Sequence, residues 1–164
     1  MVARRFIWIA LILSLAACKK PDAPYAVRGV MDLRNHHWDK EGPISLQGTW
    51  LFFWQEFLDP TSPLEGGSFI QAPGTWNEFK TESGKANGAG YATYALKILT
   101  APNSELALRI QYFDSSYRLY ANGRFLAQAG IPGTYAEGSA PDRRPTTVRL
   151  MPHNGTIDLV IHIS

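Results

Sequence analysis

An all-β fold of the β-sandwich or β-barrel kind is what this sequence of 164 residues predicts. Eight Phe, seven Tyr and five Trp accompany fourteen Gly and eleven Pro, a composition typical of short strands joined by tight turns. Apolar and polar residues alternate with period 2 in about nine or ten short runs, separated by turn signals roughly every eight to twelve residues. No amphipathic helix stands out, and the length favours one domain.

The strongest of these signals lie in the middle of the chain. Three alternating runs follow one another there, at 106–112, 117–121 and 124–129. Asn122-Gly123 separates the last two, and this dipeptide favours a type I′ hairpin turn because both central residues need a positive φ. The turn-forming segment 114–116 separates the first two. We therefore expect three consecutive antiparallel strands.

Further strands and two long loops complete the predicted domain. The other strands are expected at 27–33, 49–54, 69–72, 94–98, 146–151 and 156–164. The run 49–54 is apolar on both faces, as in a strand covered on both sides. One helical turn is expected at 55–58, before Asp59-Pro60. The polar segments 77–89 and 131–145 are expected to be exposed loops, and long loops of this kind often carry function.

The N-terminal residues are expected to lie outside this domain. An apolar run at 6–15 follows a basic pair and is shorter than the ~20 residues of a membrane span. The next residues, LAAC at 15–18, resemble a bacterial lipobox, which implies a signal peptide over 1–17 and a lipid anchor on Cys18. The alternative is an ordinary secretory signal with an incidental cysteine. Residues 18–26 are rich in proline and charge and would form a tether.

The lipobox resemblance also implies a location. Lys19, rather than Asp, follows the cysteine, and under the sorting rule that accompanies the resemblance this favours the outer membrane. The domain would then lie in the cell envelope, at the periplasmic face of a membrane. As part of a receptor it would be anchored in the inner membrane instead.

Charge and cysteine content exclude several classes of function. The chain has 16 basic and 14 acidic residues, and Arg4 and Arg5 of the predicted signal peptide account for the excess. The mature domain is therefore close to neutral, so nucleic-acid binding lacks its electrostatic driving force. A single cysteine excludes an internal disulfide.

Several short motifs occur in an order that resembles a known series. They are Leu46-Gln47-Gly48-Thr49-Trp50, Ala72-Pro73-Gly74-Thr75-Trp76, Gly88-Ala89-Gly90-Tyr91, Tyr120-Ala121-Asn122-Gly123, and then Gly130. The series is similar to the galactose-binding-like jelly roll that forms the sugar-binding domain of family-two glycoside hydrolases. The resemblance implies a galactose-binding-like jelly-roll β-sandwich.

A closer resemblance covers nearly all of 27–164. The runs 30–34, 48–54 and 119–123 are similar to strands in the extracellular jelly-roll module of bacterial seven-transmembrane receptors with diverse intracellular signalling modules. The resemblance implies binding of a small, carbohydrate-like ligand. It also implies downstream membrane-spanning domains with a kinase or nucleotide-cyclase output. This chain stops before any of these, so we expect it to be the leading part of a longer protein.

Signals for catalysis, cofactors and metals are weak. The segment 83–86 lacks the Ser or Thr that follows Lys in a phosphate-binding loop, and no nucleophile elbow occurs. No motif selects a pair of carboxylates for glycoside hydrolysis. We therefore expect no catalytic residue, cofactor or metal. The four histidines, at positions 36, 37, 153 and 162, are expected to be solvated rather than metal ligands.

Aromatic residues at loop entrances are the remaining functional signal. Sugar-binding sites pair an aromatic ring with a few polar side chains. The loops 74–91 and 131–145 are expected to flank one shallow site. Its candidate ligand-binding residues are Trp76, Asn77, Tyr91, Arg118 and Tyr135.

For two of these candidates the sequence leaves both roles open. Trp76 is either core or site, and Arg118 either a solvated strand charge or a ligand contact. Trp50 and Trp54, by contrast, are expected in the core.

The combined prediction is a lipid-anchored, extracytoplasmic jelly roll that binds a carbohydrate-like ligand as the sensor part of a membrane signalling protein. One alternative is an accessory sugar-binding domain of a glycoside hydrolase. Another is a structural envelope lipoprotein that binds protein.

Overall fold

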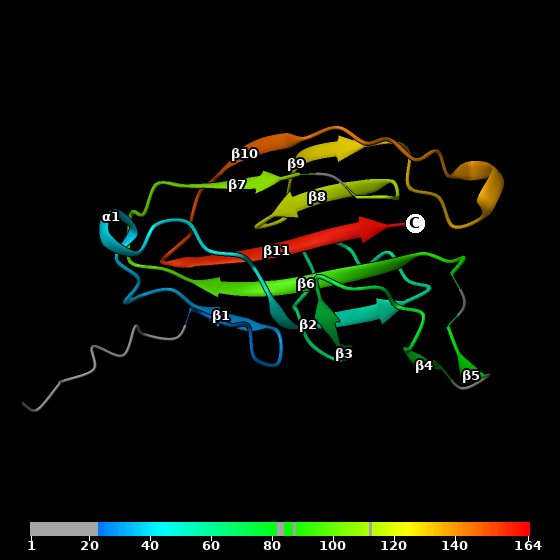
Figure 1. Ribbon diagram of the computed structural model, residues 1–164, viewed down its shortest axis with the longest axis horizontal. Coiled ribbons are helices and arrows are strands. Elements are labelled where there is room, and N and C mark those ends of the chain that lie inside the picture. The colour runs from blue at the N-terminus through cyan, green and yellow to red at the C-terminus, as the bar shows by residue number, and fades with distance from the viewer. Residues whose placement is uncertain (1–22, 82–83, 87, 112) are drawn as a thin grey trace, which may run out of the picture.

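The computed structural model describes residues 23–81, 84–86, 88–111 and 113–164 and confirms the predicted all-β sandwich (Figure 1). The larger layer consists of β1 (Val30–Asp32), β2 (Gly48–Trp54), β3 (Ser68–Ala72), β6 (Ala92–Leu99), β8 (Tyr117–Ala121), β9 (Arg124–Ala129) and β11 (Thr156–Ile163). Its strand order is β3-β2-β6-β11-β8-β9, and β1 pairs with β6 in parallel. The long strands β6 and β11 form its centre.

The smaller layer is an antiparallel pair, β7 (Leu106–Ile110) and β10 (Thr146–Leu150). Three consecutive antiparallel strands were predicted at 106–129. The prediction is wrong for the first of them, β7, which pairs with β10 and not with β8. Residues 114–116 do not form a hairpin with β7, because the chain crosses there from one layer to the other. Leu106, Leu108 and Val148 turn inward and pack against the core of the larger sheet.

The predicted hairpin between β8 and β9 is confirmed. Asn122 and Gly123 have φ values of 49° and 75°, so both central residues of the turn are left-handed, as a type I′ turn requires. The side chain of Asn122 ties this turn to neighbouring chain segments. Its Oδ1 accepts the Asp158 N–H at 2.8 Å, and its Nδ2 donates to the Met151 carbonyl at 3.0 Å.

The core lies between the two layers and follows the alternation of the sequence. Leu96 of β6, Leu119 of β8 and Leu159 of β11 are all fully buried there. Each side chain of this size stabilises the fold by about 1.5–3 kcal/mol when removed from water. Trp50 is 5% exposed and belongs to this core, as predicted, while Trp54 is partly buried against it.

The outer face of the larger sheet carries a second, smaller apolar cluster. It contains Leu51, Phe53, Ala95 and Val160, with Leu58 and Leu64 packed on top. This arrangement explains why β2 is apolar on both faces.

The segment 55–67 covers this cluster and is not helical at 55–58, so the predicted helical turn is wrong there. Thr93 holds the segment in place, since its hydroxyl accepts the Leu58 N–H at 3.0 Å and donates to the Glu56 carbonyl at 2.8 Å. A turn of helix occurs instead at α1 (Trp38–Glu41), in a stretch without apolar periodicity.

The N-terminal predictions fall mainly outside the described residues. The signal peptide, Cys18 and Lys19 all lie in 1–22. Ala26, at the end of the predicted tether, is fully buried against β2, and its N–H donates to the Gln47 carbonyl at 2.8 Å. In the described part of the chain, no helix has the length and apolar character needed to cross a membrane.

The two predicted loops gather at one end of the sandwich, near the end of β11 (Figure 1). The segment 77–89 is more ordered than an exposed loop, because it contains the short hairpin of β4 (Lys80–Thr81) and β5 (Gly84–Lys85). Phe79 anchors this hairpin, with its ring 4.6 Å from that of Phe52. The segment 131–145 contains the 3₁₀ turn η1 (Ala136–Gly138).

Candidate ligand-binding site

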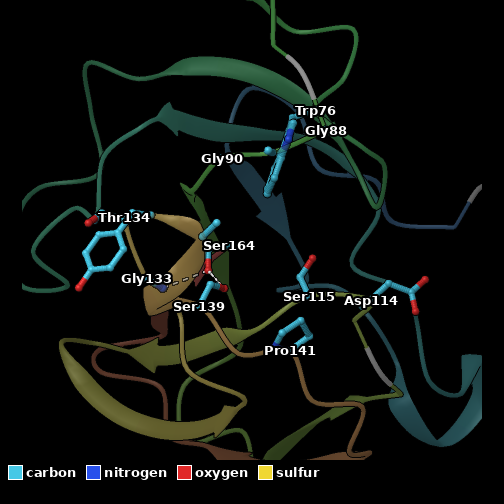
Figure 2. A pocket seen from close by; sticks show the side chains of 13 residues that line it. Trp76, Gly88, Gly90, Asp114, Ser115, Gly133, Thr134, Ser139, Pro141 and Ser164 are labelled. Carbon is cyan, nitrogen blue, oxygen red and sulfur yellow. Dashed lines mark hydrogen bonds between the residues drawn. The ribbon is translucent and has the colours of Figure 1, made fainter.

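A hollow of about 370 Å³ lies at this end of the sandwich, where the two loop segments face each other. That volume is within the range of small-molecule sites. Figure 2 shows Trp76 on one side of the hollow, with Ser139 and Ser164 across from it and Asp114 and Ser115 along another wall. The lining residues are Trp76, Gly88, Ala89, Gly90, Asp114, Ser115, Gly133, Thr134, Tyr135, Ala136, Ser139, Pro141 and Ser164.

The segment 131–145 forms one wall because it folds back on itself. Ile131 and Ala140 exchange two backbone hydrogen bonds, of 2.8 and 3.0 Å, which close the segment into a compact loop. Gly130 makes this closure feasible, since its φ is +68° and a Cβ there would lie 2.0 Å from the Ala140 carbonyl oxygen. Tyr135, at the tip of this wall, is 66% exposed.

Three serine hydroxyls form a triangle beside the hollow. The Oγ atoms of Ser116, Ser139 and Ser164 lie 2.8 to 3.2 Å from one another. The Gly133 N–H also donates to the Ser164 Oγ at 3.1 Å. Ser116 is fully buried, while Ser139 and Ser164 line the hollow. The triangle therefore joins three distant parts of the chain, and it sets two of its hydroxyls at the wall of the hollow.

Trp76 forms the apolar wall opposite the serines. Its ring meets that of Trp54 edge to face, with centroids 5.6 Å apart. Gly90 allows the segment after β5 to approach the same aromatic pair, because a Cβ at this position would lie 2.4 Å from Trp54 Cη2. Trp76 thus packs against the core and also lines the hollow, while its role in ligand binding stays a prediction.

Asp114 places a carboxylate at the rim. Its Oδ1 lies 2.9 Å from Arg143 Nη2, and both side chains are more than two-thirds exposed. The pair joins the crossing segment 114–116 to the loop 131–145. An exposed pair of this kind adds little to stability.

The structure brings two of the five predicted site residues together. Trp76 and Tyr135 both line the hollow, whereas Asn77 is exposed beside it and does not. Arg118 lies on the outer face of the larger sheet, where its Nε donates to Gln128 Oε1 at 2.9 Å. Tyr91 follows Gly90 directly but turns away, with its ring 5.0 Å from Phe57.

Tyr91 belongs instead to an aromatic cluster around His162. The His162 ring stacks on Phe57 at 4.8 Å, and its Nε2–H donates to the Leu58 carbonyl at 2.8 Å. Burial lowers the pKa of His162 below its usual value, and the cation of Arg118 acts in the same direction, while the Leu58 hydrogen bond opposes both. The ring is therefore neutral at neutral pH.

The prediction that the histidines are solvated is wrong at two positions. His162 is 7% exposed, and the side chain of His36 is 2% exposed. His36 Nδ1 lies 2.7 Å from Glu41 Oε2, and its Nε2 lies 2.9 Å from the Gly42 carbonyl oxygen. Both rings are thus used in local structure. Within the described ranges, no group of three or more His, Cys, Asp or Glu side chains is arranged to hold a metal.

Sequence reasoning missed the polar half of the hollow. Ser139, Ser164 and the carboxylate of Asp114 line it, yet 114–116 reads only as a turn and Ser164 only as the end of a strand. No local signal marks them, because Ser116 and Ser164 are 48 positions apart and meet through backbone bonds beside β8 and β11.

Comparisons with known proteins establish the fold. No protein-family model matches the chain, and no curated protein matches it. Among solved structures, the β-glucuronidase of Faecalibacterium prausnitzii is similar with a TM-score of 0.55 and 22% identity, covering 74% of this chain and 20% of that one. The Bifidobacterium dentium β-glucuronidase complexed with coumarin-3-O-glucuronide has a TM-score of 0.54 and 16% identity, with 73% and 19% covered.

This chain thus spans about a fifth of the length of those enzymes. At such identities the likeness concerns the fold alone, which is an all-β sandwich, as predicted. The neighbours are glycoside hydrolases, so the distant structural resemblance to a domain of such enzymes is confirmed. The resemblance to the receptor module stays a prediction.

Proposed function

We propose that this domain binds a small carbohydrate-like ligand in the hollow and carries out no chemistry on it. The observation that carries the proposal is the hollow itself, in which the ring of Trp76 faces the hydroxyls of Ser139 and Ser164. A pyranose has the same duality, with apolar C–H faces and a rim of hydroxyl groups. Aromatic stacking on one side and hydroxyl hydrogen bonds on the other would hold it.

The fold neighbours support this proposal. They are named as β-glucuronidases, which are carbohydrate-acting enzymes, and they share with this chain only about a fifth of their length. We infer that the shared part is an accessory domain rather than a catalytic one. The hollow also lacks the pair of carboxylates that glycoside hydrolysis needs, since Asp114 is the one acidic side chain among its described lining residues.

The biological context is the finer part of the proposal. The lipobox-like LAAC at 15–18 and the receptor-like motifs favour a lipid-anchored sensor domain of a membrane signalling protein in the cell envelope. The genomic DNA after the codon for Ser164 tests this context. A continuing frame that encodes membrane spans would support the sensor, whereas a glycosidase barrel would support the accessory domain of an enzyme.

Ligand binding is tested by a glycan array combined with variants of both aromatic walls. Trp76→Ala should weaken binding by about 1–3 kcal/mol, the scale of a large apolar contact. Tyr135→Ala should also weaken binding. Because Tyr135 is mostly exposed, the melting temperature of this variant should equal that of the wild type. Trp38→Ala is the matched control, since Trp38 is an exposed tryptophan in α1 at the other end of the sandwich (Figure 1).

Two results would contradict the proposal. One is a wild-type protein that binds no glycan on the array. The other is full binding by Tyr135→Ala together with a Trp76→Ala variant that melts far earlier, which would leave Trp76 with a role in the core alone.

A further inference from the structure

We infer that the hollow selects an uncharged sugar and rejects the corresponding uronate. This inference rests on the proposed function and adds the charge class of the ligand. It concerns position C6 of a pyranose, where a neutral hexose carries CH₂OH and a uronate carries a carboxylate.

The polar groups of the hollow suit hydroxyl partners. Ser115 and Thr134 contribute hydroxyls to the lining, and a hydroxyl both donates and accepts. The hydroxyls of Ser139 and Ser164 also line the hollow, but they are already bonded to each other and to Ser116. Sugar hydroxyls have the same double character, so contacts with Ser115 and Thr134 can form in either direction. The Gly133 N–H already donates to Ser164 Oγ at 3.1 Å and helps to fix this oxygen in place.

No cation lines the hollow among the residues that the structure describes. Lys, Arg and His are absent from that lining, and Asp114 contributes a negative charge. A carboxylate bound there would lose water without gaining a counter-ion, which is unfavourable. Asp114 would add a repulsion that its ion pair with Arg143 offsets in part.

Arg143, which contacts the rim residue Asp114, is already paired. Arg143 Nη2 lies 2.9 Å from Asp114 Oδ1. Because Asp114 already offsets the charge of Arg143, a uronate near this pair would gain little net attraction. Arg144 and Lys85 on the neighbouring loops are likewise paired, with Asp142 and Glu78 respectively.

Matched pairs of sugars test the inference on the purified protein. The probes are methyl β-glucopyranoside and methyl β-galactopyranoside, each compared with its C6 acid by NMR titration. At least one neutral glycoside should bind, and its acid should bind at least about tenfold more weakly, a ratio that corresponds to 1.4 kcal/mol.

Two variants separate the causes. Asp114→Asn removes the negative charge and frees Arg143. It should therefore improve binding of the acid relative to the neutral sugar by about fivefold, which is near the effect of one charge contact at ~4 Å in water. Arg143→Gln should leave the preference for the neutral sugar in place.

The outcomes distinguish this inference from the proposed function. An acid that binds as tightly as its neutral partner, or that loses its binding in Arg143→Gln and at high salt, would overturn the inference and leave sugar binding intact. Failure of all four sugars to bind would overturn both.

Discussion

Replacing Gly123 by valine tests the hairpin between β8 and β9 most directly. Gly123 has a φ of +75°, where a β-branched residue is strongly disfavoured. Holding valine in this conformation costs about 1–3 kcal/mol. The turn cannot relax easily, because the Asn122 side chain is hydrogen-bonded to the backbone of both Asp158 and Met151.

A second cost arises from packing. A Cβ at Gly123 would lie 2.9 Å from Thr61 Cγ2, so the Thr61 side chain must move away from its hydrogen bond with Asp59 or the segment 55–67 must shift. We expect another ~1–2 kcal/mol from this crowding, near the low end for overpacking because Thr61 is on an exposed segment. The free energy of unfolding should therefore fall by roughly 2–5 kcal/mol.

The matched control is Gly66→Val. Gly66 has a φ of +81°, but no heavy atom lies within 4 Å of its Cβ position. This variant should show the backbone cost alone, and in a less constrained segment. Urea denaturation of the three proteins gives the comparison. Equal losses for both variants would refute the packing argument, and an unchanged midpoint for Gly123→Val would refute the assignment of the turn.

Two further predictions concern the anchor and the outer face. Cys18→Ser should release the protein in soluble or unprocessed form, and metabolic labelling with a fatty acid that marks the variant as strongly as the wild type would contradict the lipid anchor. Because burial lowers the pKa of His162 in the fold, the unfolded chain takes up the proton first as the pH falls below about 6.5. The free energy of unfolding should therefore decrease on acidification. His162→Gln should lessen the decrease measured between pH 7.5 and pH 5.5. An identical pH dependence in both proteins would show that His162 is not its cause.

The candidate site was predictable only in its aromatic half. Trp76 and Tyr135 stand out in the sequence because each is a large aromatic residue in or beside a polar loop. Both line the hollow, and aromatic rings of this kind are common in ligand sites. Tyr91 looks the same by that criterion, yet it packs on Phe57 over the other face of the sheet. The direction in which a ring at a loop entrance turns depends on the packing partner that the fold places beside it. Residues adjacent in the sequence do not indicate this direction.

Local patterns by themselves determined most of the strands and the hairpin turn. Alternation follows from one buried face per strand, and Asn122-Gly123 follows from the backbone angles that its turn requires. Both are properties of consecutive residues, so they can be read along the chain.

Pairing partners and the hollow were decided by the tertiary structure alone. β7 resembles β8 in its alternation, but it crosses to the smaller layer and pairs with β10, because covering the core requires a second apolar surface. That crossing places Asp114 and Ser115 at the hollow, while the pairing of β11 with β8 sets Ser164 beside Ser116. These neighbours are distant in sequence, and it is the burial of shared apolar faces that brings them together.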